Sequence, residues 1–329
     1  MNKKRKISLL ILLSMIISIF AVGCGAEKAE ETSFGSIEAN IATLKGPTSM
    51  GMINMIDKQM LNNDMTKVNY EIIETPTLMM GKVLNNEVQI AAVPTNLAAI
   101  LYNKTEGEYQ FLAENTLSVL HIVGREDITS LEDLVGKKVI TSGKNTVVEY
   151  AINYILKSNN LMDKIEVEYL PDHASTAQTI LAGDADYAIL PQPFVTQVVM
   201  TDKNIKRYID LNDEWTKIDN NNSVLCMGCL IVNKEFYDNN TAFVEAFLKL
   251  YKQSVDFTNN NPEEASIMIE KAGILPKAKL AELAIPDSNI VFKNAADSKA
   301  EITEFLTILF ESNPASIGGK MPDEGFFAD

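Results

Sequence analysis

Short apolar runs rich in Val, Ile and Ala alternate with helix-like runs along most of this chain, and that alternation limits the folds open to it. Val68–Glu74 and Val88–Val93 have the character of strands, and the segments that follow them, Thr77–Leu84 and Asn96–Asn103, have helical spacing. Strands that alternate with helices build βαβ units, in which the strands lie parallel and the helices cover the sheet. The alternation therefore predicts an α/β protein with mostly parallel sheets.

The order of the segments predicts two lobes. The alternation continues to about Leu190, a strand-like run follows at Val224–Val232, and helix-like runs occupy the chain after Asn233. This order is expected when a second α/β lobe is inserted into the first, so that two strands form a hinge. At about 150 residues per domain, a chain of 329 residues has room for both lobes. We predict that lobe 1 contains residues 37–122 and 228–329, and that lobe 2 contains residues 123–227.

The first 24 residues indicate export from the cytoplasm. Basic residues 3–6 precede an apolar run, Ile7–Val22, which ends at Gly23 and Cys24. A membrane-spanning helix needs about 20 apolar residues, so this shorter run is typical of a signal peptide. We expect residues 1–23 to be that peptide, with an uncleaved membrane anchor as the alternative, and residues 24–36 to be a flexible tether. Either alternative places the folded body outside the cytoplasm.

Charge and composition argue against several classes of function. Lys and Arg number 29 and Asp and Glu number 44, and the net charge of −15 repels the phosphates of nucleic acids. With two His and three Arg in the chain, we expect neither a His-rich metal site nor an arginine clamp for anions. We expect no cofactor and no catalytic residue, because the common hydrolase, metalloprotease and nucleotide-binding motifs are missing from the sequence.

Two cysteines lie in an apolar, β-branched run. The spacing of Cys226 and Cys229 is that of a CxxC motif, which in an exported protein serves redox chemistry or metal binding in some cases. On a regular strand, however, residues three apart point to opposite faces of the sheet. We therefore expect buried free thiols, and keep a disulfide or a chemical role as alternatives. Among other residues, we expect His121 and Trp215 to be buried structural residues and His173 to serve a loop or a helix cap.

Five strand-to-helix turns are rich in Pro, Gly, Ser, Thr and Asn. In open α/β sheets the carboxyl ends of the strands face a ligand crevice, and helix starts present free backbone N–H groups there. Several such turns around one crevice form a polar cage, although the same residues also cap helices without binding anything. The turns are residues 45–51, 75–77, 93–96, 142–146 and 190–194.

Motifs at five places resemble those of a known family, and they are Lys45–Pro47, Ala92–Ala99, Leu131–Lys137, Leu190–Phe194 and Gly318–Asp323. Together, behind the lipobox-like Ala21–Cys24, they are similar to the nitrate/sulfonate/taurine group of ABC-transporter substrate-binding lipoproteins. The resemblance implies a type 2 periplasmic-binding-protein fold that closes on a small solute and delivers it to a membrane permease. It also implies that Cys24 is lipidated and anchors a monomer to the membrane.

The turns that match the cleft-facing turns of this family supply mostly neutral groups, which favours a neutral, zwitterionic or weakly anionic organic solute. Lys144 is a nearby cation, and Met50 and Phe194 offer an apolar face. A ligand-sensing lipoprotein is one alternative. An enzyme is another, because pyrimidine synthases share this fold, but they cluster His and Cys near a lysine. The expected ligand-binding residues are Gly46, Thr48, Ser49, Met50, Thr95, Asn96, Ser142, Lys144, Asn145, Thr146, Gln192 and Phe194.

Overall fold

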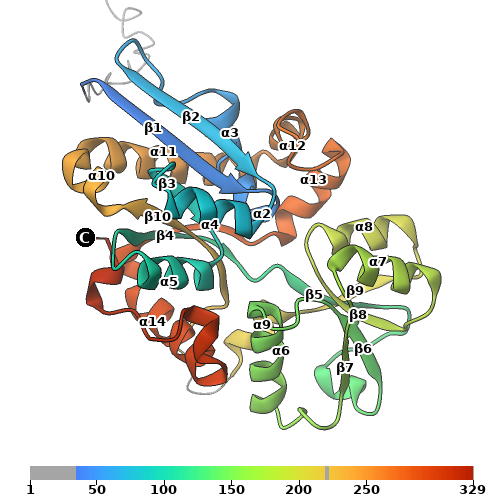
Figure 1. Cartoon of the computed structure of the whole chain (residues 1–329). Coiled ribbons are helices and arrows are strands. Elements are labelled where there is room, and N and C mark those ends of the chain that lie inside the picture. Colours follow the sequence, from blue (N-terminus) through green and yellow to red (C-terminus); the bar gives the residue numbers. More distant parts are fainter. Residues whose placement is uncertain (1–34, 219–221, 329) are drawn as a thin grey trace, which may run out of the picture. The chain divides into compact units, whose positions relative to one another are not determined.

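A computed structural model describes residues 35–218 and 222–328 of the chain (Figure 1). The predicted signal peptide, Cys24 and most of the predicted tether lie outside the described residues. No helix in the described ranges has both the length and the apolar character needed to span a bilayer.

The first sheet, sheet A, has six strands in the order β11-β4-β10-β3-β1-β2. Strand β1 is parallel to β2 and β3, whereas β10 runs antiparallel between β3 and β4, and β11 is antiparallel to β4. Near-continuous apolar runs such as that of β3 suit strands buried on both faces. The bounds are β1 (Ile37–Leu44), β2 (Thr66–Ile73), β3 (Ile90–Val93), β4 (Tyr109–Leu117), β10 (Cys226–Asn233) and β11 (Ile290–Asn294).

Helices cover both faces of sheet A, and residues of one strand alternate between the two faces. Helices α4, α5 and α14 share one apolar core with Ala42, Leu44 and Phe111, while α3 and α11 contact each other on the other face. The helices that belong to this sheet are α2 (Pro47–Met50), α3 (Ile53–Asp57), α4 (Pro76–Leu84), α5 (Thr95–Lys104), α10 (Lys234–Asn239), α11 (Thr241–Asn260), α12 (Pro262–Lys271), α13 (Ala278–Ala284), η2 (Ile285–Asp287), α14 (Ala295–Ser312), η3 (Pro314–Ile317) and η4 (Glu324–Phe326).

The second sheet, sheet B, has the strand order β7-β6-β8-β5-β9. Strand β6 is parallel to β7 and β8, and β5 is antiparallel to β8 and β9. The bounds are β5 (Leu120–Gly124), η1 (Leu131–Leu134), β6 (Lys138–Thr141), α6 (Val147–Ser158), β7 (Glu166–Tyr169), α7 (His173–Ala182), β8 (Tyr187–Pro191), α8 (Phe194–Thr201), β9 (Lys206–Asp210) and α9 (Leu211–Thr216).

The α/β class is confirmed, but the sheets are mixed rather than mostly parallel. Among the described strands, four pairings are parallel and five are antiparallel. The reason lies in β5 and β10, the first strands after each passage of the chain between sheets. Each runs against both of its neighbours, which accounts for four of the five antiparallel pairings.

The chain passes between the sheets twice. Strand β4 continues through Ser118 and Val119 into β5, and the chain returns from α9 to β10 (Figure 1). Sheet B thus begins at Leu120 and sheet A resumes at Cys226, slightly before the predicted lobe boundaries at 122/123 and 227/228.

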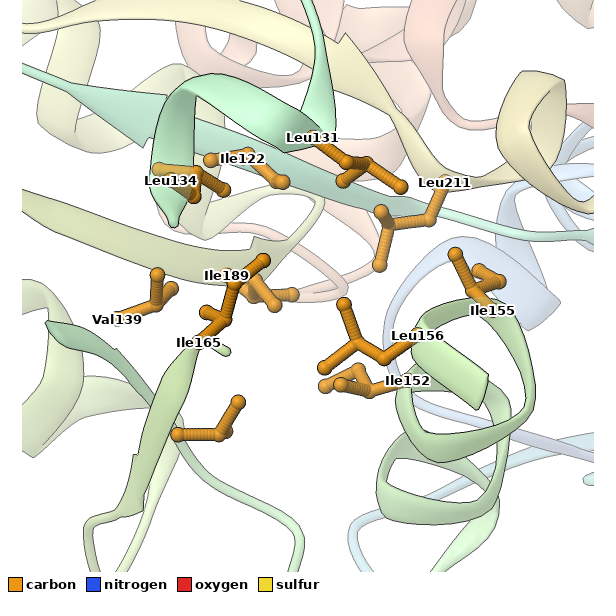
Figure 2. A pocket seen from close by; sticks show the side chains of 11 residues that line it. Ile122, Leu131, Leu134, Val139, Ile152, Ile155, Leu156, Ile165, Ile189 and Leu211 are labelled. Carbon is orange, nitrogen blue, oxygen red and sulfur yellow. The ribbon is translucent and has the colours of Figure 1, made fainter. Parts of the chain in front are cut away.

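A small apolar cavity lies inside the core of sheet B. Its volume is about 20 Å³, and it is lined by side chains of the strands, of η1 and of α6, including Val139, Ile155 and Ile189. Figure 2 shows these aliphatic side chains pointing toward one another between the sheet and the helix. The lining contains no polar side chain, which makes this cavity a packing defect rather than a site for a polar solute.

The C-terminal segment packs back on sheet A. Phe326 is almost fully buried, and its ring lies 5.3 Å from that of Tyr102 and 5.7 Å from that of Phe111. The Tyr102 hydroxyl also donates a hydrogen bond to Asp323. The segment after η3 is therefore part of the core of the sheet.

Candidate functional site

The carboxyl ends of parallel strands from both sheets lie level with the crossing between them. In sheet A, Val93 at the end of β3 is paired with Cys229 of β10. In sheet B, Leu120 at the start of β5 is paired with Pro191 at the end of β8. Ligands of open α/β sheets bind outside these carboxyl ends. We call the ends of β1, β3, β6 and β8 together with residues 118–119 the junction, and it is the candidate site.

The predicted turn after β1 forms the short helix α2. Gly46 precedes it with a φ of 116°, a positive value that favours glycine, and Pro47 takes the first helical position. The Ser49 hydroxyl donates to the Gly46 carbonyl at 2.8 Å, and Ser49 and Met50 are fully buried. Thr48 is half-buried. Of the predicted residues here, Thr48 therefore presents the side chain most open to a solute.

The predicted turn after β3 begins helix α5. Thr95 is fully buried, and its hydroxyl donates to the Cys226 sulfur at 3.3 Å. Asn96 is half-buried, and its amide donates to the Ser316 carbonyl at 3.2 Å. Thr95 thus ties α5 to the returning strand β10, and Asn96 ties it to the C-terminal segment. Their roles as ligand contacts remain predictions.

Ser142 and His173 form a close polar pair where β6 ends and α7 begins. Ser142 is buried, and its Oγ lies 2.5 Å from Nδ1 of His173. Burial lowers the pKa of His173, although Asp172 opposes the shift, and the imidazole is therefore uncharged at neutral pH. The ring of Phe194, at the start of α8, lies 5.7 Å from the imidazole.

His173 is thus a candidate site residue that the sequence analysis assigned to a loop or a cap. It lies in the turn after β7, next to the turns that carry Ser142 and Phe194. The turn that carries His173 lies at the same carboxyl edge of the sheet as the turns predicted to bind the solute. That position could have identified His173 from the sequence.

Lys144, Asn145 and Thr146 lie on the loop between β6 and α6, and all three are exposed. Thr146 caps α6 by accepting a hydrogen bond from the backbone N–H of Val148 at 3.3 Å. The backbone N–H of Asn145, which has a φ of 61°, donates to the Glu149 carboxylate at 2.6 Å. The loop is therefore held by local hydrogen bonds, and within the described residues the side chains of Lys144 and Asn145 form no hydrogen bond or ion pair.

Gln192 lies at the crossing itself. Its backbone N–H donates to the Val119 carbonyl at 2.9 Å, and its side-chain oxygen accepts from the Thr196 hydroxyl at 2.8 Å. Its buried Nε2 has no hydrogen-bond partner within the described residues. A buried amide donor left unpaired costs about 1–3 kcal/mol. Gln192 therefore retains unused hydrogen-bonding capacity next to the junction.

The sequence analysis missed a polar stretch in β4, Glu114 to Thr116. Charged and amide side chains are rare within strands, so residue preference alone ends the strand at Ala113. The strand in fact continues to Leu117, and each of the three side chains is at most 2% exposed. The backbone of this stretch pairs with β10 on one side and with β11 on the other. This pairing outweighs the low preference of charged and amide side chains for strands.

Cys226 and Cys229 are buried free thiols, as predicted. The expectation that they point to opposite faces is wrong, because both sulfurs lie beside Thr95. Irregularities in the pairing of β10 with β4 between these residues break the alternation of a regular strand. Burial raises the pKa of both thiols, so both are protonated at neutral pH.

The charged groups around the junction are largely paired. Lys45 forms an ion pair with Glu74 at 3.1 Å. Within the part of the chain that the structure covers, no three metal-ligating side chains gather into one group. The junction thus presents mainly neutral hydrogen-bonding groups and aromatic rings. The two described arginines form the ion pairs Arg125–Asp202 and Arg207–Asp287.

Comparison with known families gives one match. Residues 106–265, which include all of sheet B and strand β10, match the family described as NMT1/THI5 like. Comparison with curated protein sequences gives no match.

Several solved structures share the fold. An ABC transporter protein from Parabacteroides distasonis is 22% identical with a TM-score of 0.76, over 88% of this chain and 98% of that one. The periplasmic aliphatic sulphonate binding protein of Escherichia coli is 15% identical with a TM-score of 0.68, over 88% and 95%. The periplasmic nitrate-binding protein of Synechocystis PCC 6803 is 12% identical with a TM-score of 0.59, over 84% and 82%.

These likenesses confirm the resemblance indicated by the sequence motifs. They also establish the two-lobed fold of periplasmic binding proteins for this chain.

Proposed function

We propose that this protein captures a small organic solute between its two lobes and delivers it to an ABC importer. The observation that carries the proposal is the convergence of polar turns from both sheets on the junction, where Gln192 and the Ser142–His173 pair retain hydrogen-bonding groups. Proteins of similar fold are described as binding aliphatic sulphonate and nitrate, which supports solute capture rather than catalysis.

Capture follows from the two-lobe layout. With residues 37–122 and 228–329 as lobe 1 and residues 123–227 as lobe 2, the two passages of the chain between the sheets form the hinge. Hinge closure brings the turns of both sheets onto one solute, so that the full set of contacts forms only in the closed state. Contacts already link the lobes, since the Asn313 amide donates to the Tyr150 hydroxyl at 2.9 Å.

The solute is a neutral, zwitterionic or weakly anionic small molecule. His173 is uncharged at neutral pH, and Arg125 and Arg207 are held in ion pairs, which leaves Lys144 as the exposed cation among the predicted contacts. A dianion requires more positive charge than this. The aromatic pair of His173 and Phe194 offers a surface for a planar or apolar part of the solute.

The delivery role includes anchoring at the membrane. We propose that residues 1–23 are removed and that Cys24 carries the lipid, so that a monomer stays near its permease. A Cys24→Ser variant should then move from the membrane fraction to the soluble fraction, and a variant that stays in the membrane fraction would point to the uncleaved anchor.

Solute binding is tested by native mass spectrometry of the purified protein, followed by thermal shift with nitrate, methanesulfonate, taurine, hydroxymethylpyrimidine and thiamine. Binding to the folded state raises the melting temperature. A folded protein with no retained mass and no shift across the panel would count against capture. Uptake of the bound solute by vesicles that contain the partner permease separates import from sensing.

A pair of matched variants tests the site. The solute for this test is the panel member that raises the melting temperature. Asn145→Ala should weaken its binding about 2- to 10-fold, because the variant loses one neutral hydrogen bond. Asn160→Ala is the control, because Asn160 is also exposed and also has a positive φ, but lies beyond the far end of α6. Equal effects of the two changes would remove Asn145 from the site.

A further inference from the structure

The chain has two histidines, and the fold uses their ring nitrogens differently. His121 is buried, with Nδ1 3.2 Å from the Val119 carbonyl and Nε2 3.3 Å from the Asp210 carboxylate. His173 is half-buried, and within the described residues only its Nδ1 has a hydrogen-bond partner, the Ser142 hydroxyl at 2.5 Å. Both nitrogens of His121 are therefore engaged by the fold, whereas Nε2 of His173 is left for another molecule.

The Ser142 hydroxyl fixes which nitrogen of His173 carries the proton. Ser142 is buried, and in the described part of the chain its O–H group has no acceptor other than Nδ1 of His173. A buried hydroxyl that donates to nothing costs about 1–3 kcal/mol, so the O–H donates and Nδ1 accepts. Burial holds the pKa of His173 below its ordinary value, which keeps the ring neutral at neutral pH. A neutral imidazole carries one N–H group, which is then Nε2–H.

The charged groups near His173 leave this N–H group free. Asp172 precedes His173, but its carboxylate accepts from the backbone N–H of Ser175 at 2.7 Å and caps α7. Helix α7 packs against α8, β8 and β6 (Figure 1). The residues of α8 and those of α7 after His173 are uncharged, and Lys138 of β6 lies at the opposite end of that strand from Ser142. Nε2–H is therefore a single, neutral donor.

An aromatic ring lies beside this donor. Phe194 begins α8 and is half-buried, and its ring centroid lies 5.7 Å from that of the His173 ring. Ser142 follows β6 and Phe194 follows β8, and these two strands are neighbours in sheet B. Because both rings are partly exposed, they belong to the surface at the junction and not to the core beneath it. A solute that reaches this surface meets one donor at the edge of an aromatic face.

We propose that His173 sets part of the solute specificity, because its Nε2–H donates to an acceptor group of the solute while Phe194 contacts the planar or apolar body that carries this group. Ser142 is the positioning residue, since it holds the ring in the tautomer that donates. A carbonyl oxygen, a sulfonate oxygen or a ring nitrogen satisfies this donor, whereas an ammonium group, which only donates, does not. This inference rests on the proposed solute capture and narrows its substrate class.

The first test needs no solute. NMR signals of 15N-labelled imidazole distinguish the two neutral tautomers, and a His173→Gln variant identifies the signals of His173. The wild-type protein should show the Nε2–H tautomer at neutral pH, and Ser142→Ala should increase the share of the Nδ1–H tautomer. Ser266→Ala is the matched control, since Ser266 is also buried but donates to the Glu263 carbonyl at 2.7 Å on α12. A wild-type Nδ1–H tautomer, or no increase in Ser142→Ala, would overturn the proposal.

The second test uses three probes with the same phenyl body, measured by isothermal titration calorimetry at physiological ionic strength. Benzamide and benzenesulfonate offer acceptor oxygens, whereas benzylamine is protonated at neutral pH and offers only donors. The wild-type protein should bind one or both acceptor probes more tightly than benzylamine, and His173 should keep its Nε2–H tautomer in that complex. Tighter binding of benzylamine, no binding of any probe, or a change of His173 to the Nδ1–H tautomer would overturn the assigned chemistry.

Two substitutions of His173 separate the roles of its nitrogens. The side-chain amide of Gln reaches the position of Nε2, whereas that of Asn reaches only the position of Nδ1. His173→Gln should therefore bind the tighter acceptor probe nearly as well as the wild type, and His173→Asn should bind it about 2- to 10-fold more weakly, because it loses one neutral hydrogen bond. Equal affinities of the two variants would overturn the role of Nε2. Failure of solute capture itself appears differently, as a wild-type protein that retains no solute and gives no thermal shift with any member of the wider panel.

Discussion

We expect the free energy of unfolding to fall as the pH rises toward 8, because the buried carboxyl group of Glu114 ionises. This carboxyl is 2% exposed on β4, and one of its oxygens has no hydrogen-bond partner among the described residues. The pKa of Glu114 is raised to about 8, mainly by burial and also by the neighbouring Glu301, while Lys293 opposes the shift. At neutral pH the Glu114 side chain therefore holds a proton that it would release on unfolding.

The sign and size of the effect follow from that proton. Between pH 4.5 and pH 8 the folded protein binds one more proton than the unfolded chain, so the free energy of unfolding falls as the pH rises. Stability from this group is complete below pH 4.5 and is lost as the pH passes through about 8. At about 1.4 kcal/mol per pH unit, the loss across this window is at most about 5 kcal/mol.

The test is Glu114→Gln, which keeps the shape and a donor toward Glu301 but cannot ionise. Urea unfolding from pH 5 to pH 9, followed by the fluorescence of the buried single tryptophan Trp215, gives the free energy at each pH. The variant should match the wild type near pH 5 and exceed it above pH 8. Glu245→Gln, on the exposed side of α11, is the control and should keep the wild-type slope. A Glu114→Gln profile with the full wild-type slope would refute the reasoning.

Three further predictions use the same unfolding assay or a labelling assay. Val139→Ile should raise the free energy of unfolding by about 0.5 kcal/mol, because it fills the 20 Å³ cavity at about 24 cal/mol per Å³, and a decrease would show that the added methylene does not reach the void. Phe326→Ala should lower it by about 3–5 kcal/mol through lost packing on sheet A, whereas a change below 1 kcal/mol would mean that the segment is dispensable. Cys226 and Cys229 should resist a thiol reagent until the protein unfolds, since burial raises the pKa of both, and rapid labelling of either in the native protein would contradict this placement.

The alternation of strand and helix runs was sufficient to predict the fold class and the turns at the carboxyl ends of the strands. The turns that carry Gly46, Thr95, Ser142 and Gln192 all lie at such ends. The alternation of strand-like and helix-like runs is a local property, because each run depends on residues close together in the chain. The directions of β5 and β10 depend on where the chain enters a sheet after each crossing. Local sequence patterns do not contain the place of entry.

The buried polar residues near the junction were harder to predict. Asn115 and Glu114 interrupt an apolar run, and propensity alone ends the strand there. Their burial depends on β10 and β11, which are more than 100 residues away in the sequence. His173 was missed for a related reason, since its contact with Ser142 joins two turns that are adjacent only in the folded sheet. Sites of this kind depend on pairings that follow from topology rather than from composition.

The strand order of the two sheets also bears on the order in which the sheets form during synthesis. All strands of sheet B come from one continuous stretch, Leu120 to Asp210, and can pair as soon as that stretch has emerged. Sheet A receives its central strand β10 only afterwards, and β10 then joins β3 and β4, which were made more than 100 residues earlier. Pairings of such long range form slowly. We therefore expect sheet B to form before sheet A is complete, because β3 and β4 have no neighbouring strand between them until β10 has been made.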